Sequence, residues 1–199
     1  MSTVVRLRTS GLMALFVALP LWGHPGHDHA APLVGAGASL VAGVLHPLTG
    51  VDHLFAMVAL GVWSALTTRR VWLAPLGFAV MLMVGAVLGL VGVPLPAIEP
   101  MIAASLFVLG LLIAVRARLP EMAGIIVAGV FAMFHGAAHG GELPAGASAL
   151  PYMVGFLLST VALHGAGIGA GLAMRHARIW LIRLLGGGVA LYGAFLLST

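Results

Sequence analysis

The sequence predicts an all-α fold: a polytopic transmembrane helical bundle of six spans after a signal peptide, with a short extra half-helix before the first full span. Three observations predict it. The 199 residues are 61% hydrophobic and 7% charged, with a mean hydropathy of +1.15, far above ordinary soluble domains. The 28 glycines suit helices that associate in lipid through small residues. No alternation at period two is present, so a β-barrel is not expected.

The charged and sulfur-containing residues exclude several classes of function. The nine positive charges are all Arg, against five acidic residues, and in so apolar a chain they indicate membrane orientation rather than nucleic-acid binding. The chain has no Cys, which excludes disulfides, thiolate metal ligands and iron–sulfur clusters. His, Asp, Glu and Met side chains remain as the available metal ligands.

The first 23 residues have the pattern of a secretory signal peptide. A basic region with Arg6 and Arg8 precedes a short apolar run, as in such leaders. We expect cleavage after Gly23, so that residues 1–23 are removed. Leu21 is large for the −3 position, which leaves an uncleaved membrane anchor as the alternative.

Residues 24–31 are expected to form a His-rich segment outside the membrane. The segment carries His24, His27 and His29. Imidazoles at this density are typical of a tract that captures metal, although a solvated polar linker is the plainer interpretation. The remaining residues, 32–199, are expected to form a single transmembrane domain.

One apolar stretch, residues 31–68, begins this domain and contains the ionisable octet 46–53. It is longer than the about 20 residues of one span and slightly short for two spans joined by a loop. We therefore expect residues 32–45 to form a half-helix or re-entrant element, and the stretch to cross the membrane once. The further spans are expected at residues 71–93, 101–115, 121–139, 151–174 and 179–197.

The arginines indicate the orientation, because cytoplasmic loops collect positive charge. If residues 31–68 cross once, from outside to inside, every Arg after residue 23 falls on the cytoplasmic face; if they cross twice, every one falls outside. These residues are Arg69, Arg70, Arg116, Arg118, Arg175, Arg178 and Arg183. We therefore expect a multi-pass protein of the bacterial inner membrane, with both mature termini on the extracytoplasmic side.

The first chemically distinctive motif is His46-Pro-Leu-Thr-Gly-Val-Asp52-His53. Ionisable side chains at membrane depth are energetically expensive and mark functional sites. Pro47 is best tolerated in the first turn of a helix. We therefore expect His46 to end one helix and His53 to lie in the next, with Gly50 permitting a break. Broken helices beside ionisable groups form the ion sites of many transporters.

The second motif is Phe134-His135-Gly-Ala-Ala-His139-Gly-Gly-Glu142-Leu-Pro144. On a helix, His135, His139 and Glu142 would form one stripe, because they lie at positions i, i+4 and i+7. The residue after His135 is Gly rather than the Glu of an H-E-x-x-H metalloprotease, so zincin chemistry is not expected.

Both motifs fall at the same membrane face in this topology. A single buried His often has a purely structural hydrogen bond. Four His with two carboxylates instead favour a metal site, since neutral imidazole is the commonest metal ligand and a carboxylate fixes its tautomer.

Two further residues are candidates for the pathway of the ion, namely Met57, one turn after His53, and His164. A glycine-rich packing helix explains His164 equally well. The candidate ligands are His46, Asp52, His53, His135, His139 and Glu142.

These motifs carry a family likeness. The first resembles that of the HupE/UreJ family of nickel permeases, in which a His is followed after five residues by Asp-His, and the second resembles the second motif of that family. The likeness covers the whole mature chain with its six spans, and it includes the cleaved leader. The resemblance implies nickel uptake into the cytoplasm by facilitated diffusion, for hydrogenase or urease maturation, with the same six residues as metal ligands.

The expected function is therefore transport of a divalent transition metal, without catalytic residues or a resident cofactor. Ni²⁺ is the expected ion, but imidazole and carboxylate ligands also suit Co²⁺, Zn²⁺ and Cu²⁺. The expected partners are the metal ion and the lipid bilayer, not nucleic acid, and a homo-oligomer is left open. The alternatives are an intramembrane metal-dependent enzyme, a metal-binding sensory or structural membrane subunit and, less favoured, a haem-binding bundle.

Overall fold

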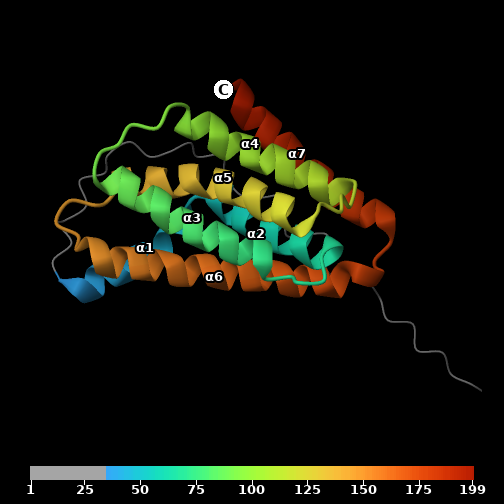
Figure 1. The fold of residues 1–199 in the computed structure, drawn as a ribbon, viewed down its shortest axis with the longest axis horizontal. Helices are drawn as coiled ribbons and strands as arrows, with labels where there is room; N and C mark the ends of the chain where they lie inside the picture. The colour runs from blue at the N-terminus through green and yellow to red at the C-terminus, as the bar shows by residue number, and fades with distance from the viewer. Residues whose placement is uncertain (1–34) are drawn as a thin grey trace, which may run out of the picture. The chain divides into compact units, whose positions relative to one another are not determined.

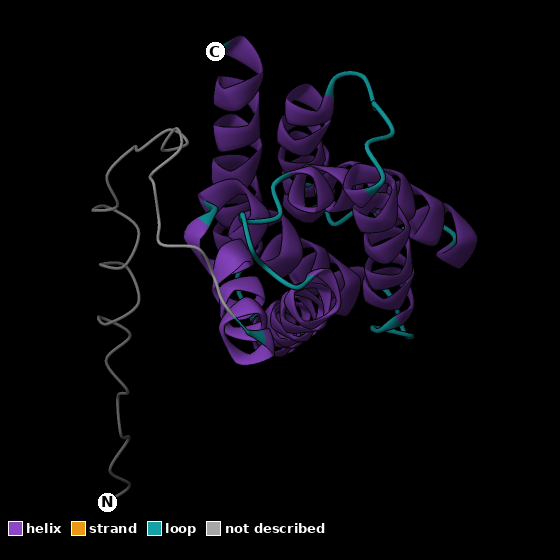
Figure 2. Cartoon of the chain, turned by 90° about the vertical axis from the view of Figure 1, so that its left-hand side faces the viewer, coloured by secondary structure: helices purple, strands orange, loops and turns teal. Residues whose placement is uncertain are grey.

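The computed structural model describes residues 35–199, which form an all-α bundle without strands in that part of the chain (Figures 1 and 2). The predicted fold class is confirmed. The expected signal peptide at residues 1–23 and the His-rich segment at residues 24–31 lie outside the described residues. The elements are α1 (Ala36–Thr49), α2 (Val51–Thr67), α3 (Leu73–Leu90), α4 (Ile98–Ala114), α5 (Glu121–Gly141), α6 (Ala149–Ala173), the 3-10 helix η1 (Met174–His176) and α7 (Ile179–Ser198).

Several of these helices have the length and composition of membrane spans. Among the described residues, α3, α5, α6 with η1, and α7 each meet both criteria, and α1 and α2 meet them together as a pair bent by 79°. The apolar helix α4 is slightly shorter, at 17 residues. The chain is a multi-pass membrane protein, and the expected number of six spans requires that the bent pair and α4 also cross.

Gly50 separates α1 from α2. Its backbone is extended, with φ −84° and ψ 107°, and its N–H donates to the His46 carbonyl oxygen. The predicted break at Gly50 is confirmed, but the predicted helix end at His46 is wrong, because α1 ends at Thr49.

The position of Pro47 differs from the prediction, because it lies in the last turn of α1 rather than in the first turn of α2. The first helix therefore continues to Thr49, beyond the expected half-helix of residues 32–45. Pro47 costs α1 one backbone hydrogen bond. The turn is closed at its end by the His46 carbonyl oxygen, which accepts from the Thr49 hydroxyl over 2.8 Å and from the Gly50 N–H over 3.4 Å.

The helices pack closely through glycine. A Cβ at Gly85 of α3 would overlap the backbone of α5, one at Gly110 of α4 would overlap that of α7, and one at Gly167 of α6 would overlap that of α2. The expected association through small residues is confirmed, as in other helical membrane proteins. Two of these contacts fix helices that carry the motifs, since they join α2 to α6 and α5 to α3.

The connections that follow α2, α4 and α6 gather at one end of the bundle, the right-hand end in Figure 1. There the Trp63 indole N–H donates to the Ala117 carbonyl oxygen over 2.9 Å, and the Arg175 guanidinium donates to the Ala65 carbonyl oxygen over 3.0 Å. This end carries the arginines of these connections. The start of α2 and the end of α5, which carry the two motifs, lie away from it.

Candidate metal site

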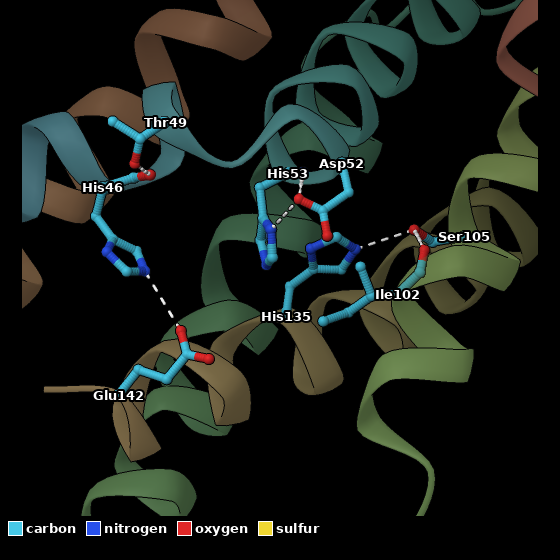
Figure 3. A network of polar contacts seen from close by, with 8 residues as sticks. All are labelled: His46, Thr49, Asp52, His53, Ile102, Ser105, His135 and Glu142. Atoms are coloured by element: carbon cyan, nitrogen blue, oxygen red, sulfur yellow. Dashed lines mark hydrogen bonds and ion pairs between the residues drawn. The ribbon is translucent and has the colours of Figure 1, made fainter. Parts of the chain in front are cut away.

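The residues of the two motifs meet where three helix ends converge (Figure 3). The first motif spans the last turn of α1 and the first turn of α2, and the second occupies the C-terminal turns of α5. Because the chain bends at Gly50, the first motif contributes side chains from two helices rather than from one face. The assembled residues are His46, Asp52, His53, His135, His139 and Glu142.

An outer group consists of His46, His139 and Glu142. Each can offer one ligand atom, and these three atoms lie within 4.8 Å of one another. The Nε2 atom of His46 lies 3.6 Å from a carboxylate oxygen of Glu142, and both side chains are partly exposed, at 29% and 45%. Two imidazoles and a carboxylate at this spacing form a donor set that fits a divalent transition metal.

An inner group consists of Asp52, His53 and His135, all buried. One carboxylate oxygen of Asp52 accepts hydrogen bonds from both the backbone N–H and the Nδ1 atom of His53, each over 2.8 Å. Because an ionised carboxylate only accepts, His53 carries its proton on Nδ1 and keeps the Nε2 lone pair available. This Nε2 atom is buried and has no hydrogen-bond partner among the described residues.

His139 connects the two groups. Its ring centroid lies 4.6 Å from that of His46 and 4.2 Å from that of His53. The ring of His135 lies 4.8 Å from that of His53, and the His139 side chain packs against Phe156 at 4.3 Å. Imidazoles from the two motifs therefore form one continuous cluster, running from a partly exposed position to a fully buried one.

The other predicted candidates lie elsewhere. Met57 is fully buried and belongs to the same apolar core cluster as Trp63 and Phe156. His164 in α6 is 1% exposed, and neither of its ring nitrogens has a hydrogen-bond partner in the described part of the chain. The expected capture residues His24, His27 and His29 lie outside the described residues.

Three residues at the site were not predicted from the sequence. Ser105 of α4 makes a 2.9 Å hydrogen bond to His135 Nε2. The ring of Tyr152 lies 5.8 Å from that of His46, and the ring of Phe78 lies 5.7 Å from that of His135. Their only sequence signal is a hydroxyl or an aromatic ring within an apolar span, which is equally typical of ordinary helix packing.

Comparisons with known proteins agree with the likeness of the motifs. Residues 12–196 match the family described as HupE / UreJ protein. The chain is also 42% identical over 193 residues to Protein HupE of Rhizobium leguminosarum bv. viciae, which covers 96% of this chain and 99% of that relative. No solved structure matches the chain. A match over nearly the whole length, together with both motifs, leads to one conclusion: this chain belongs to the HupE/UreJ family.

Proposed function

We propose that this protein carries a divalent transition metal, with nickel as its physiological substrate, into the cytoplasm by facilitated diffusion to supply hydrogenase or urease maturation. The observation that carries the proposal is the continuous imidazole cluster, in which His139 contacts both His46 and His53. Family membership and the multi-pass fold support it.

The two groups suggest successive positions for the ion. The outer group, in which His46 and Glu142 are partly exposed and His139 is buried, would first replace part of the water shell of the metal. His139 would then pass the ion to the buried Nε2 atom of His53. Transfer between neighbouring imidazoles keeps each step short, and it avoids a bare cation in a low-dielectric interior, which would be very costly.

The ligand chemistry favours a borderline transition metal but not nickel alone. Imidazole nitrogen and carboxylate oxygen bind Ni²⁺, Co²⁺, Zn²⁺ and Cu²⁺, and intrinsic affinity is highest for copper. Selectivity for nickel must therefore come from the geometry and number of the ligands. Competition by Co²⁺, Zn²⁺ and Cu²⁺ for nickel uptake will rank the four ions directly.

The positions of the arginines indicate the proposed orientation of the protein in the membrane, and with it the direction of transport. Their end of the bundle would face the cytoplasm, as the positive-inside rule requires, and the outer group would face the extracytoplasmic side. The segment with His24, His27 and His29 would then lie on the side from which metal arrives. His164, whose ring lies 5.1 Å from that of Phe78, would be a later position on the same path.

Uptake of radioactive nickel into proteoliposomes tests the proposal. The wild-type protein is expected to fill the lumen, and His53→Ala and His139→Ala are each expected to abolish uptake while the protein stays folded. The matched control is His176→Ala, because His176 is exposed in η1, among the arginines. If nickel binds tightly to wild type but never reaches the lumen, the transport function is wrong. An intramembrane enzyme or a metal sensor would then be the favoured function.

A further inference from the structure

Ser105 lies in α4, a helix to which neither motif belongs, yet its hydroxyl reaches the buried inner group (Figure 3). The Ser105 oxygen lies 2.6 Å from the Ile102 carbonyl oxygen and 2.9 Å from His135 Nε2. Ser105 and His135 are both fully buried, at 0% exposure. Water is therefore no ready substitute for either contact.

These two hydrogen bonds determine where the protons lie. A carbonyl oxygen can only accept, so the single hydroxyl proton of Ser105 is donated to Ile102. The Ser105 oxygen can then only accept from His135, which must carry its proton on Nε2. The Nδ1 atom of His135 is consequently left with a free lone pair, and it has no hydrogen-bond partner among the described residues.

The Nδ1 atom of His135 lies on the side of its ring that faces His53, another member of the inner group. Figure 3 shows the ring of His135 with one nitrogen toward Ser105 and the other toward His53, and the two rings lie 4.8 Å apart. Asp52 fixes the opposite tautomer on His53, with the proton on Nδ1 and the lone pair on Nε2. Both imidazoles therefore present an unprotonated nitrogen within the buried group.

We propose that Ser105 is a positioning residue that holds His135 as the Nε2–H tautomer and so presents Nδ1 as the metal ligand. The assignment rests on the proposed function in one respect, namely that the inner group binds the transported metal. Hydrogen-bond partners of this kind commonly orient the His ligands of metal sites and change metal affinity by about 10–100-fold. Here the partner is a serine on a neighbouring helix.

The binding test uses the full chain in detergent, with Ni²⁺ alone as the probe. Ser105→Ala is expected to weaken nickel binding by about 10–100-fold, and Ser105→Thr, which keeps the hydroxyl, to restore most of it. Ser64→Ala is the matched control, because Ser64 is also fully buried and donates to a carbonyl oxygen, that of Val71. An affinity of Ser105→Ala equal to that of wild type would overturn the inference.

A double-mutant cycle separates positioning from general packing. If Ser105 acts through His135, Ser105→Ala is expected to cause no further loss of affinity once His135→Ala is present. A loss of equal size in both backgrounds would show that the serine acts on the bundle as a whole, and would overturn the assignment. Elution as one folded species by size exclusion is required of each variant.

Nitrogen-15 NMR of the metal-free protein reads the tautomer without any assumption about transport. The signals absent from His135→Ala identify His135. Wild type is expected to show a protonated Nε2, and Ser105→Ala to shift the population toward protonated Nδ1. A protonated Nδ1 on His135 in wild type would overturn the inference even if nickel is transported. The expected tautomer in a protein that neither binds nor transports nickel would uphold the positioning and overturn the proposed function instead.

Discussion

The ring centroids of His53 and His139 lie 4.2 Å apart, and this contact joins the two histidine motifs. His53 lies in the first turn of α2, just after the bend at Gly50, whereas His139 lies near the end of α5. The glycine contacts of these two helices are with other neighbours: α2 packs against α6 at Gly167, and α5 packs against α3 at Gly85. One ion between these rings would have ligands from two distant parts of the sequence.

Asp52→Asn is expected to weaken nickel binding by about 10–100-fold, because the carboxylate that orients His53 through two hydrogen bonds is lost. Isothermal titration with Ni²⁺ measures the change. The matched control is Glu121→Gln, which removes an acid that pairs with Arg70 among the arginines. Equal losses in the two variants would mean that net charge, rather than orientation of His53, governs affinity.

Glu142→Gln is expected to raise the nickel concentration for half-maximal uptake several-fold while changing the maximal rate less. Glu142 is a partly exposed member of the outer group that it forms with His46 and His139, so its loss weakens capture of the ion before it reaches the buried residues. Initial rates of uptake over a range of nickel concentrations separate the two parameters. A fall in maximal rate alone would place Glu142 at a later step than the outer group implies.

Gly167→Ala is expected to destabilise the protein by about 1–3 kcal/mol, as overpacking does, because the added Cβ would overlap the carbonyl of Val58 in α2. Gly169→Ala in the same helix is the control, since its Cβ would meet nothing within 4 Å. Thermal unfolding in one detergent compares the two variants. A similar loss of stability in both would contradict the packing of α6 against α2.

His164→Leu is expected to leave nickel affinity at the cluster nearly unchanged and to lower the rate of uptake, because it removes two buried ring nitrogens but keeps an apolar side chain against Phe78. Binding and uptake are measured on the same preparation. Unchanged uptake would mean that His164 is a packing residue and not part of the path.

Much of the fold follows from the sequence because membrane helices are limited by simple physical requirements. The apolar stretches that are bounded by Arg or Pro locate α3, α5, α6 and α7 to within a few residues. The break before His53 follows from Gly50. The position of Pro47 was predicted wrongly because the preference of proline for the first turn of a helix reflects one lost N–H, whereas the structure continues α1 through Pro47 to Thr49 and breaks the chain at Gly50.

The candidate site could be predicted only where its chemistry is uncommon in a membrane. His46, His53 and His139 are conspicuous because ionisable groups are rare in apolar spans. The bend of 79° between α1 and α2, which directs the first motif toward α5 from two helices, depends on tertiary packing. Ser105 and Tyr152 also escaped prediction, since a hydroxyl within a span becomes informative only when its neighbour is known.

X-ray absorption spectroscopy of the nickel-loaded protein tests the central claim, that one ion is bound by both motifs together. The account predicts imidazole scattering around a single nickel in wild type, reduced by both His53→Ala and His139→Ala under conditions that still load metal. A nickel environment that changes in one variant and is identical to wild type in the other would contradict a shared site.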